Sequence, residues 1–234
     1  VSNAIFAYAE RAAMKKPKQV EQYITDLIAE GEHQRLDFKF EISNARKIAR
    51  TLVAFANTDG GRLLIGVKDN GRIAGIRSDE EYYMIDSAAS LYCKPEVPFE
   101  SYHRTVQGKQ LLEVVVNRSE QKPHYARDEQ NRWVAYLRVD DENILANWIL
   151  LQVWKRKKRV RGTYITYSDQ EKKVLTYLAG HTASPMEAIV EQTGIRKRII
   201  SRILINLVSL DVVMMTYREK QFLYSIKDPG ATLF

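Results

Sequence analysis

The chain has only one cysteine, Cys93, among its 234 residues. A single thiol excludes an internal disulfide framework and a metal cluster built on cysteines, and it fits a reducing cytoplasm. No apolar run approaches the ~18 residues that a membrane-spanning helix needs, and no apolar segment follows a basic start as in a signal peptide. We therefore expect a cytoplasmic protein with no membrane partner.

Several motifs of enzymes and nucleotide-binding proteins are also missing. The chain has no Gly-Lys-Ser/Thr of a phosphate-binding loop, no Gly-x-Ser-x-Gly of a serine hydrolase and no His-x-x-x-His of a zinc site. The glycines of residues 54–76, AFANTDGGRLLIGVKDNGRIAGI, lie between a helix-like run and strands, which is the wrong order for a dinucleotide-binding loop. We expect them to end a helix and to form turns, and we expect no bound cofactor.

The positive charge is concentrated in one short run. The net charge is +7, and residues 155–167 contain six lysines and arginines but no acid. This run is interpreted as a basic linker between two domains. It is either a solvated hinge or a tether that binds phosphates, because clustered cations release counterions when they bind nucleic acid. Its cationic residues are Lys155, Arg156, Lys157, Lys158, Arg159 and Arg161.

Before the linker, we expect a helical extension over residues 1–19. We expect an α+β domain with a mixed sheet over residues 20–154. Apolar residues at helical spacing or in alternation indicate its elements. In the segment RLDFKFEI, Leu36 and Phe38 would face the core, and Asp37 and Lys39 would lie on the opposite face. We expect helices at 20–30, 43–57 and 78–92 and strands at 36–42, 62–67, 99–106, 109–117 and 133–139, with a hairpin turn at Asn70-Gly71 and a short helix at 143–153.

The part after the linker, residues 168–234, predicts a winged helix-turn-helix domain. Ser168 and Glu171 have the spacing of a capping box, and a second helix would end at Gly194. A long third helix with basic residues at its start follows, and then two strands that would form a wing. Recognition helices place such N-terminal residues at base edges, although the same charges would also solubilise a domain that contacts proteins. The candidate nucleic-acid-binding residues are Arg196, Lys197, Arg198, Ser201 and Arg202 of this helix and Arg218 and Lys220 of the wing.

Two segments carry a resemblance to a known family. EGEHQRLDFKFEI, followed by IARTLVAFANTDGGRLLIGVKDNGRIAGI, resembles the Schlafen/AlbA-type domain of bacterial regulators, and KPHY and YLRV fit its later part. The resemblance covers residues 20–147. Asp37 stands where the family usually has Glu, and Asp140 stands where Gly is common. The resemblance implies a DNA-binding domain, often followed by a winged helix.

Some animal relatives of this family cut RNA with three acidic residues, and Glu32, Asp37 and Asp69 match that pattern. Lys39 lies on the same strand face as Asp37. Carboxylates can hold Mg²⁺ or Mn²⁺, and a lysine can stabilise the attacked phosphate. The alternative is that Asp37 and Lys39 belong to a solvated strand face and that Asp69 is a turn residue.

Taken together, these patterns predict a DNA-binding transcriptional regulator that binds double-stranded DNA as a homodimer. RNA is the alternative ligand. Two other functions stay open, which are a metal-dependent endoribonuclease and a protein-interaction module.

Overall fold

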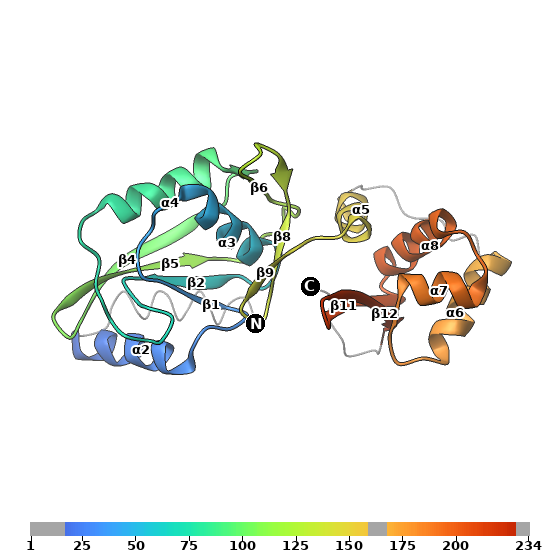
Figure 1. Ribbon diagram of the computed structural model, residues 1–234, viewed down its shortest axis with the longest axis horizontal. Coiled ribbons are helices and arrows are strands. Elements are labelled where there is room, and N and C mark those ends of the chain that lie inside the picture. The colour runs from blue at the N-terminus through green and yellow to red at the C-terminus, as the bar shows by residue number, and fades with distance from the viewer. Residues whose placement is uncertain (1–16, 159–167, 228–234) are drawn as a thin grey trace. The chain divides into compact units, whose positions relative to one another are not determined.

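The computed structural model describes residues 17–158 and 168–227 and divides into two compact units (Figure 1). The boundary between the units falls between Leu145 and Ala146. Each unit has its own sheet. In the described part of the chain, no helix has the length and apolar character that crossing a bilayer requires.

A four-stranded mixed sheet with the order β1-β2-β5-β4 is the centre of the first unit. Strands β1 (Leu36–Lys39) and β2 (Gly61–Ile65) are parallel, because helix α3 (Ala45–Asn57) connects them as a crossover. Strand β5 (Lys109–Val116) pairs antiparallel with both β2 and β4 (Phe99–Val106). The expected α+β fold with a mixed sheet is confirmed.

Helices cover both faces of this sheet. Helix α2 (Pro17–Glu30) packs on one face, and α3 and α4 (Glu80–Leu91) pack on the other (Figure 1). The close packing of α3 explains one glycine of the motif, since a Cβ atom on Gly61 would lie 2.5 Å from the ring of Phe55. As the sequence predicted, glycines follow the end of α3, and Gly61 also permits the close approach of α3 to β2, which the sequence did not predict.

The remainder of the first unit contains two small sheets. Strands β3 (Cys93–Lys94), β6 (Tyr125–Arg127) and β7 (Trp133–Val134) form one of them, and β8 (Tyr136–Val139) pairs with β9 (Glu142–Leu145) in the other. The strand expected over residues 133–139 is thus interrupted between β7 and β8.

The second unit begins with helix α5 (Trp148–Lys157), which packs against α8 (Lys197–Ser209). The buried side of α5 includes Leu150 and Val153. The domain boundary expected after Trp154 is therefore wrong, because the apolar side of α5 belongs to the core of the second unit. Residues 155–157 are helical rather than part of a linker, and residues 1–16 and 159–167 lie outside the described part.

Two further helices and a three-stranded sheet complete this unit. Helix α6 (Asp169–Ala179) starts with the predicted capping box, in which Ser168 and Glu171 exchange hydrogen bonds. Helix α7 (Met186–Thr193) ends at Gly194, which has the left-handed conformation. Strand β12 pairs with β11 on one side and with β10 on the other. The strands of this sheet are β10 (Ser184–Pro185), β11 (Val213–Arg218) and β12 (Gln221–Ile226).

Two local expectations are wrong. Asn70-Gly71 does not close a regular hairpin, since only an isolated bridge joins Val67 and Ile73. Residues 143–153 do not form one helix, because β9 and α5 divide them. The residues between these two elements include Asn147, whose side chain accepts a hydrogen bond from the amide of Leu150 and caps α5.

Candidate nucleic-acid interface

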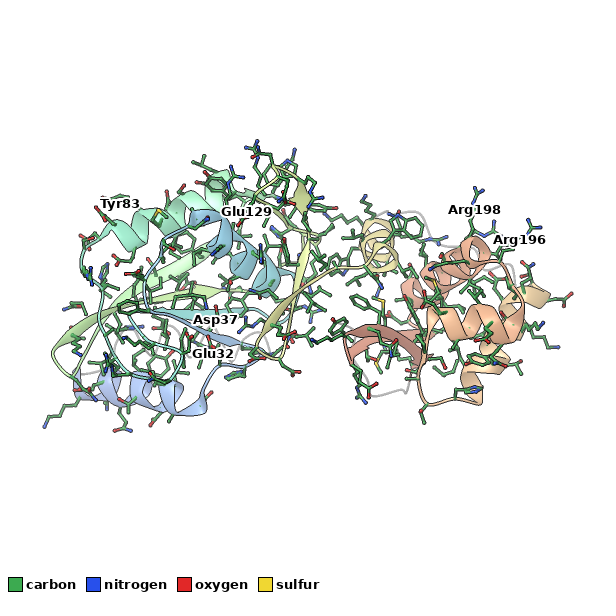
Figure 2. The ribbon with its side chains drawn as sticks, in the orientation of Figure 1. Glu32, Asp37, Tyr83, Glu129, Arg196 and Arg198 are labelled. Carbon is green, nitrogen blue, oxygen red and sulfur yellow. The ribbon has the colours of Figure 1, made fainter. Side chains whose placement is uncertain are left out.

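The start of helix α8 presents a cationic surface. Ile200, Leu204 and Leu207 face the core at helical spacing, so the opposite side of the helix is exposed. Arg196 and Arg198 lie on that side and point away from the unit (Figure 2). Neither arginine forms an ion pair with any acid among residues 17–158 and 168–227, and both guanidinium groups are therefore accessible to an anion.

A groove of about 560 Å³ lies along this arginine-rich surface. Arg202 lies one helical turn after Arg198, and the indole of Trp148 from helix α5 forms another wall. The Trp148 side chain is 59% exposed. Sequence reasoning missed this residue, because nothing local in the chain indicates that the start of α5 meets α8. The groove is lined by Trp148, Arg196, Arg198, Ile199, Arg202 and Ile205.

Two of the predicted contact residues on α8 face helix α7 instead of the groove. The Nζ of Lys197 lies 3.1 Å from the Oε1 of Glu187, and this hydrogen bond lowers the pKa of Glu187. The hydroxyl of Ser201 lies 3.6 Å from the Sδ of Met186 in α7 and also donates to the backbone oxygen of Lys197 at 2.9 Å. The structure thus brings together the three arginines of this helix and separates them from Lys197 and Ser201.

Arg218 and Lys220 lie at the tip of the β11–β12 hairpin, where both side chains are exposed. Arg218 pairs with Gln221, so Glu219 and Lys220 form a two-residue turn. Both turn residues have positive φ, 50° and 60° respectively. This is the backbone of the tight turns that suit the twist of a hairpin.

The described part of the basic run contacts α8 and the residues that follow it. Arg156 donates a hydrogen bond to the side chain of Asn206, and the Nζ of Lys157 lies 3.1 Å from the Oδ1 of Asp211. Both partners come from α8 or the residues after it. Lys155 is exposed in the last turn of α5, and Lys158 is its C-cap. Arg159 and Arg161 lie outside the described residues.

The candidate acidic site of the first unit is buried and already paired. Asp37 is 3% exposed, and its Oδ1 lies 3.1 Å from the Nη2 of Arg138. Its Oδ2 lies 2.9 Å from the Nζ of Lys39. The expected solvated face is wrong for Asp37, because Arg138 covers that side of β1.

Glu32 lies beside Asp37 (Figure 2) and accepts a hydrogen bond from the amide of Phe38 at 2.7 Å. Burial raises the pKa of the Glu32 carboxyl, and the adjacent Asp37 raises it further. The Nζ of Lys39 is 3.9 Å from Glu32. Glu32, Asp37 and Lys39 thus form one cluster with Arg138, in which two cations balance the carboxylates.

Asp69 does not belong to this cluster. It is exposed in the turn after β2. Within residues 17–158 and 168–227, no three histidine, cysteine, aspartate or glutamate side chains are grouped so as to hold a metal ion. The triad of Glu32, Asp37 and Asp69 that the endoribonuclease alternative requires is therefore not formed, and the residues present do not fit a Mg²⁺ or Mn²⁺ ion shared by those three acids.

A second buried polar cluster surrounds the KPHY segment. Asn57 at the end of α3 donates to the backbone oxygens of His124 and Tyr136 and accepts from the amide of His124. The ring of His124 contacts the hydroxyl of Ser119 at 2.7 Å. The amine of Lys122 donates to the backbone oxygen of Thr58 at 3.1 Å, and burial lowers its pKa to about 7. These contacts hold the segment against the glycine motif.

One protein family and several solved structures resemble part of this chain. Residues 32–147 match the protein family described as Schlafen, AlbA_2. The DIP2311 protein from Corynebacterium diphtheriae is 19% identical with a TM-score of 0.42, and the match covers 62% of this chain but only 33% of that protein. The N-terminal domain of an ATP-dependent DNA helicase RecG-related protein from Nitrosomonas europaea is 23% identical with a TM-score of 0.38, covering 62% of this chain and 96% of that domain. No curated protein matches the chain.

The family match confirms the resemblance that the sequence motifs carry. It includes the strand with Asp37 and Lys39, the helix end with its glycines and the later KPHY and YLRV segments. The sheet, α3 and the two polar clusters are all part of the matched region. The chain therefore contains a Schlafen/AlbA_2 family domain at residues 32–147.

Proposed function

We propose that this protein binds nucleic acid, and that its second unit binds duplex DNA as a winged helix-turn-helix domain. One observation carries the proposal. Arg196, Arg198 and Arg202 surround an open groove at the start of α8, and among the residues that the structure describes no acid pairs with the first two. Guanidinium groups in this position can bind phosphates or pair with the edge of guanine.

The order of elements supports the winged-helix assignment. Helices α6, α7 and α8 follow one another with short connections, and the β11–β12 hairpin comes directly after them. In such domains the third helix enters the major groove with its N-terminal residues, and a hairpin contacts the adjacent backbone. Lys220 at the hairpin tip would supply such a backbone contact.

We further propose that the protein is a transcriptional regulator that binds as a homodimer. The Schlafen/AlbA_2 family domain supports a role on nucleic acid. Two copies of one recognition helix read two half-sites, which multiplies the affinity of a single weak contact. This assignment predicts that two protomers bind each DNA duplex long enough to contain both half-sites when the protein is in excess.

The proposal can be tested by measuring duplex binding of the full chain over a series of salt concentrations. Replacing both Arg198 and Arg202 with alanine removes two contacts, so the affinity should fall by about tenfold or more for each. The slope of log affinity against log salt should also become shallower by about 2 if both arginines contact phosphates. The titration endpoint gives the number of protomers on each duplex.

Lys173→Ala is the matched control, because Lys173 is an exposed cation of the same unit that does not line the groove. It removes one positive charge and should leave the affinity within about twofold. Equal binding by the double arginine variant and by the Lys173→Ala variant would show that α8 is not the recognition helix.

A further inference from the structure

One face of the small sheet β3-β6-β7 carries alternating cations and aromatic rings. Lys94 pairs with Tyr125, and Arg127 pairs with Trp133. Residues directly opposite one another share a face of the sheet, and Tyr125 and Arg127 are two positions apart on one strand. All four side chains therefore lie on the same face, whereas Ala126 points to the core.

Trp133 is the most exposed aromatic ring of this face. Its side chain is 42% exposed. The Nζ of Lys94 lies 5.9 Å from the centre of the indole ring, and the Cζ of Arg127 lies 6.0 Å from it. In the described ranges, neither cation forms an ion pair, and the Nε of Arg127 has no hydrogen-bond partner. Two positive charges are thus held beside an accessible ring, and no acid of the described part of the chain pairs with them.

The beginning of helix α3 adds three more cations next to this sheet. Arg46, Lys47 and Arg50 line a small hollow of about 10 Å³ together with Arg127, and α3 packs on the side of the sheet that carries Cys93 and Ala126. Arg46 donates to the backbone oxygen of Asp128 at 2.7 Å, which ties α3 to the turn between β6 and β7. These cations of α3 are therefore not counted with the exposed face. We name that face, which consists of Lys94, Tyr125, Arg127 and Trp133, the aromatic-basic face.

The acids near this face do not cancel its charge. Asp128 is buried, and its carboxylate binds Arg132 at 2.8 Å. Glu129 is exposed in the same turn (Figure 2) and lines the hollow. Glu129 is therefore the exposed acid of this turn, and its charge lies near the face.

We propose that the aromatic-basic face binds single-stranded nucleic acid, with an unpaired base stacked on Trp133 and the adjacent phosphates held by Lys94 and Arg127. A sheet that carries aromatic rings between cations is a general solution for single strands, because every base has a face that can stack. The bases of a duplex are already stacked on each other, so they cannot occupy Trp133 without opening. This site is separate from the duplex site proposed on α8.

The experiment measures binding of a fluorescein-labelled oligo-dT of about 15 nucleotides to the full chain by anisotropy. Trp133→Ala should weaken binding by about tenfold, because it removes one stacked base. Trp133→Phe should keep most of the affinity while the quenching of tryptophan fluorescence on binding decreases. Glu129→Gln should strengthen binding by about twofold through the removed repulsion. An oligo-rU of the same length shows whether DNA or RNA is preferred.

Tyr83→Ala is the matched control, since Tyr83 is a strongly exposed aromatic residue of the same unit, 68% exposed, and belongs to neither proposed site. It should leave oligo-dT and oligo-rU binding unchanged. The inference is overturned if the full chain binds neither oligonucleotide, or if Trp133→Ala binds both as tightly as the unchanged protein. It is also overturned if Trp133→Ala alters only the mass of the assembly, which would identify a protein contact. These outcomes are independent of duplex binding by the Arg198→Ala/Arg202→Ala variant.

Discussion

Lys122 occupies an unusual place for a lysine, since it is 8% exposed and lies at the glycine motif of the Schlafen/AlbA_2 domain. Burial disfavours its charged form and lowers its pKa from 10.5 to about 7. The unfolded chain retains this proton up to about pH 10.5, whereas the folded chain releases it near pH 7. Between these values the unfolded state binds more protons, so the free energy of unfolding rises with pH.

We therefore predict that replacing Lys122 with methionine removes a pH-dependent part of the stability. The free energy of unfolding of the unchanged protein should rise, relative to that of Lys122→Met, by about 1.4 kcal/mol for each pH unit between pH 7 and 9. Urea unfolding at several pH values measures both proteins. Burial also raises the pKa of Cys93 from 9.0 to about 12, but Cys93 is present in both proteins, so its contribution cancels in the difference.

Lys173→Met is the control for this comparison, since it removes an exposed lysine of the other unit. Its stability should follow that of the unchanged protein at every pH. Parallel profiles for Lys122→Met and the unchanged protein would mean that Lys122 keeps an ordinary pKa in the folded state.

The buried state of Asp37 could not be predicted from the sequence around it. Alternation in RLDFKFEI correctly places Leu36 and Phe38 in the core, but it says nothing about the opposite face. Asp37 is buried because the guanidinium of Arg138, 101 positions later, reaches it. Such long-range pairing depends on the packing of the β8–β9 hairpin, and no local pattern encodes it.

At the scale of elements, the β11–β12 hairpin contains a local conflict between residue type and backbone. Glu219 and Lys220 both have positive φ, which is unfavourable for residues with a Cβ atom. Asparagine tolerates this region better than glutamate, and it is a preferred first residue in such turns. The backbone of the turn is suitable and only the residue type at position 219 is unfavourable, so one substitution can remove the conflict.

We predict that Glu219→Asn stabilises the second unit by about 0.5–1 kcal/mol. It should also strengthen duplex binding slightly, because it removes an acid beside Lys220. Thermal unfolding and the salt-series titration measure the two effects. Glu219→Ala is the control that removes the same charge without suiting the turn. Equal stability of the alanine and asparagine variants would contradict the turn argument.

Elements with strong local signals were predicted well from the sequence. Strand β4 has the expected bounds, and β5 ends one residue early, because clear alternation surrounds the Gln107-Gly108 turn. The capping box of Ser168 and Glu171 is present. Helix α5 was assigned to the wrong unit, because its last turn is a run of cations that is typical of a linker. Its apolar side packs against α8, which is distant in the sequence, so no local pattern predicts this contact.

At the scale of the whole molecule, the position of the boundary decides which fragments can fold. Helix α5 precedes the three helices and hairpin of the proposed winged helix, but it belongs to the same unit. Its buried side chains are Ile149, Leu150, Val153 and Trp154. A fragment that starts after α5 would expose the apolar surface of α8 that these side chains cover.

We predict that fragment 146–234 unfolds cooperatively, whereas fragment 168–234 is less stable by about 4 kcal/mol or more. This corresponds to a decrease in Tm of about 20 °C for a domain of this size. Circular dichroism during heating measures both fragments. Fragment 146–234 with Trp148→Ala keeps α5 and removes only its exposed ring, so it should behave like the parent fragment. Equal Tm values for the long and short fragments would show that α5 is not part of this core.

Helices α3 and α8 share an arrangement that opposes their own dipoles. Their first turns contain adjacent cations, Arg46-Lys47 and Lys197-Arg198, and no acid. Helices α4 and α6 instead begin with acids, which the partial positive charge of a helix start favours. A polyanion bound at either cationic helix start would neutralise these charges. Binding of the ligand would therefore also stabilise the first turn of the helix, and the two free energies would be coupled.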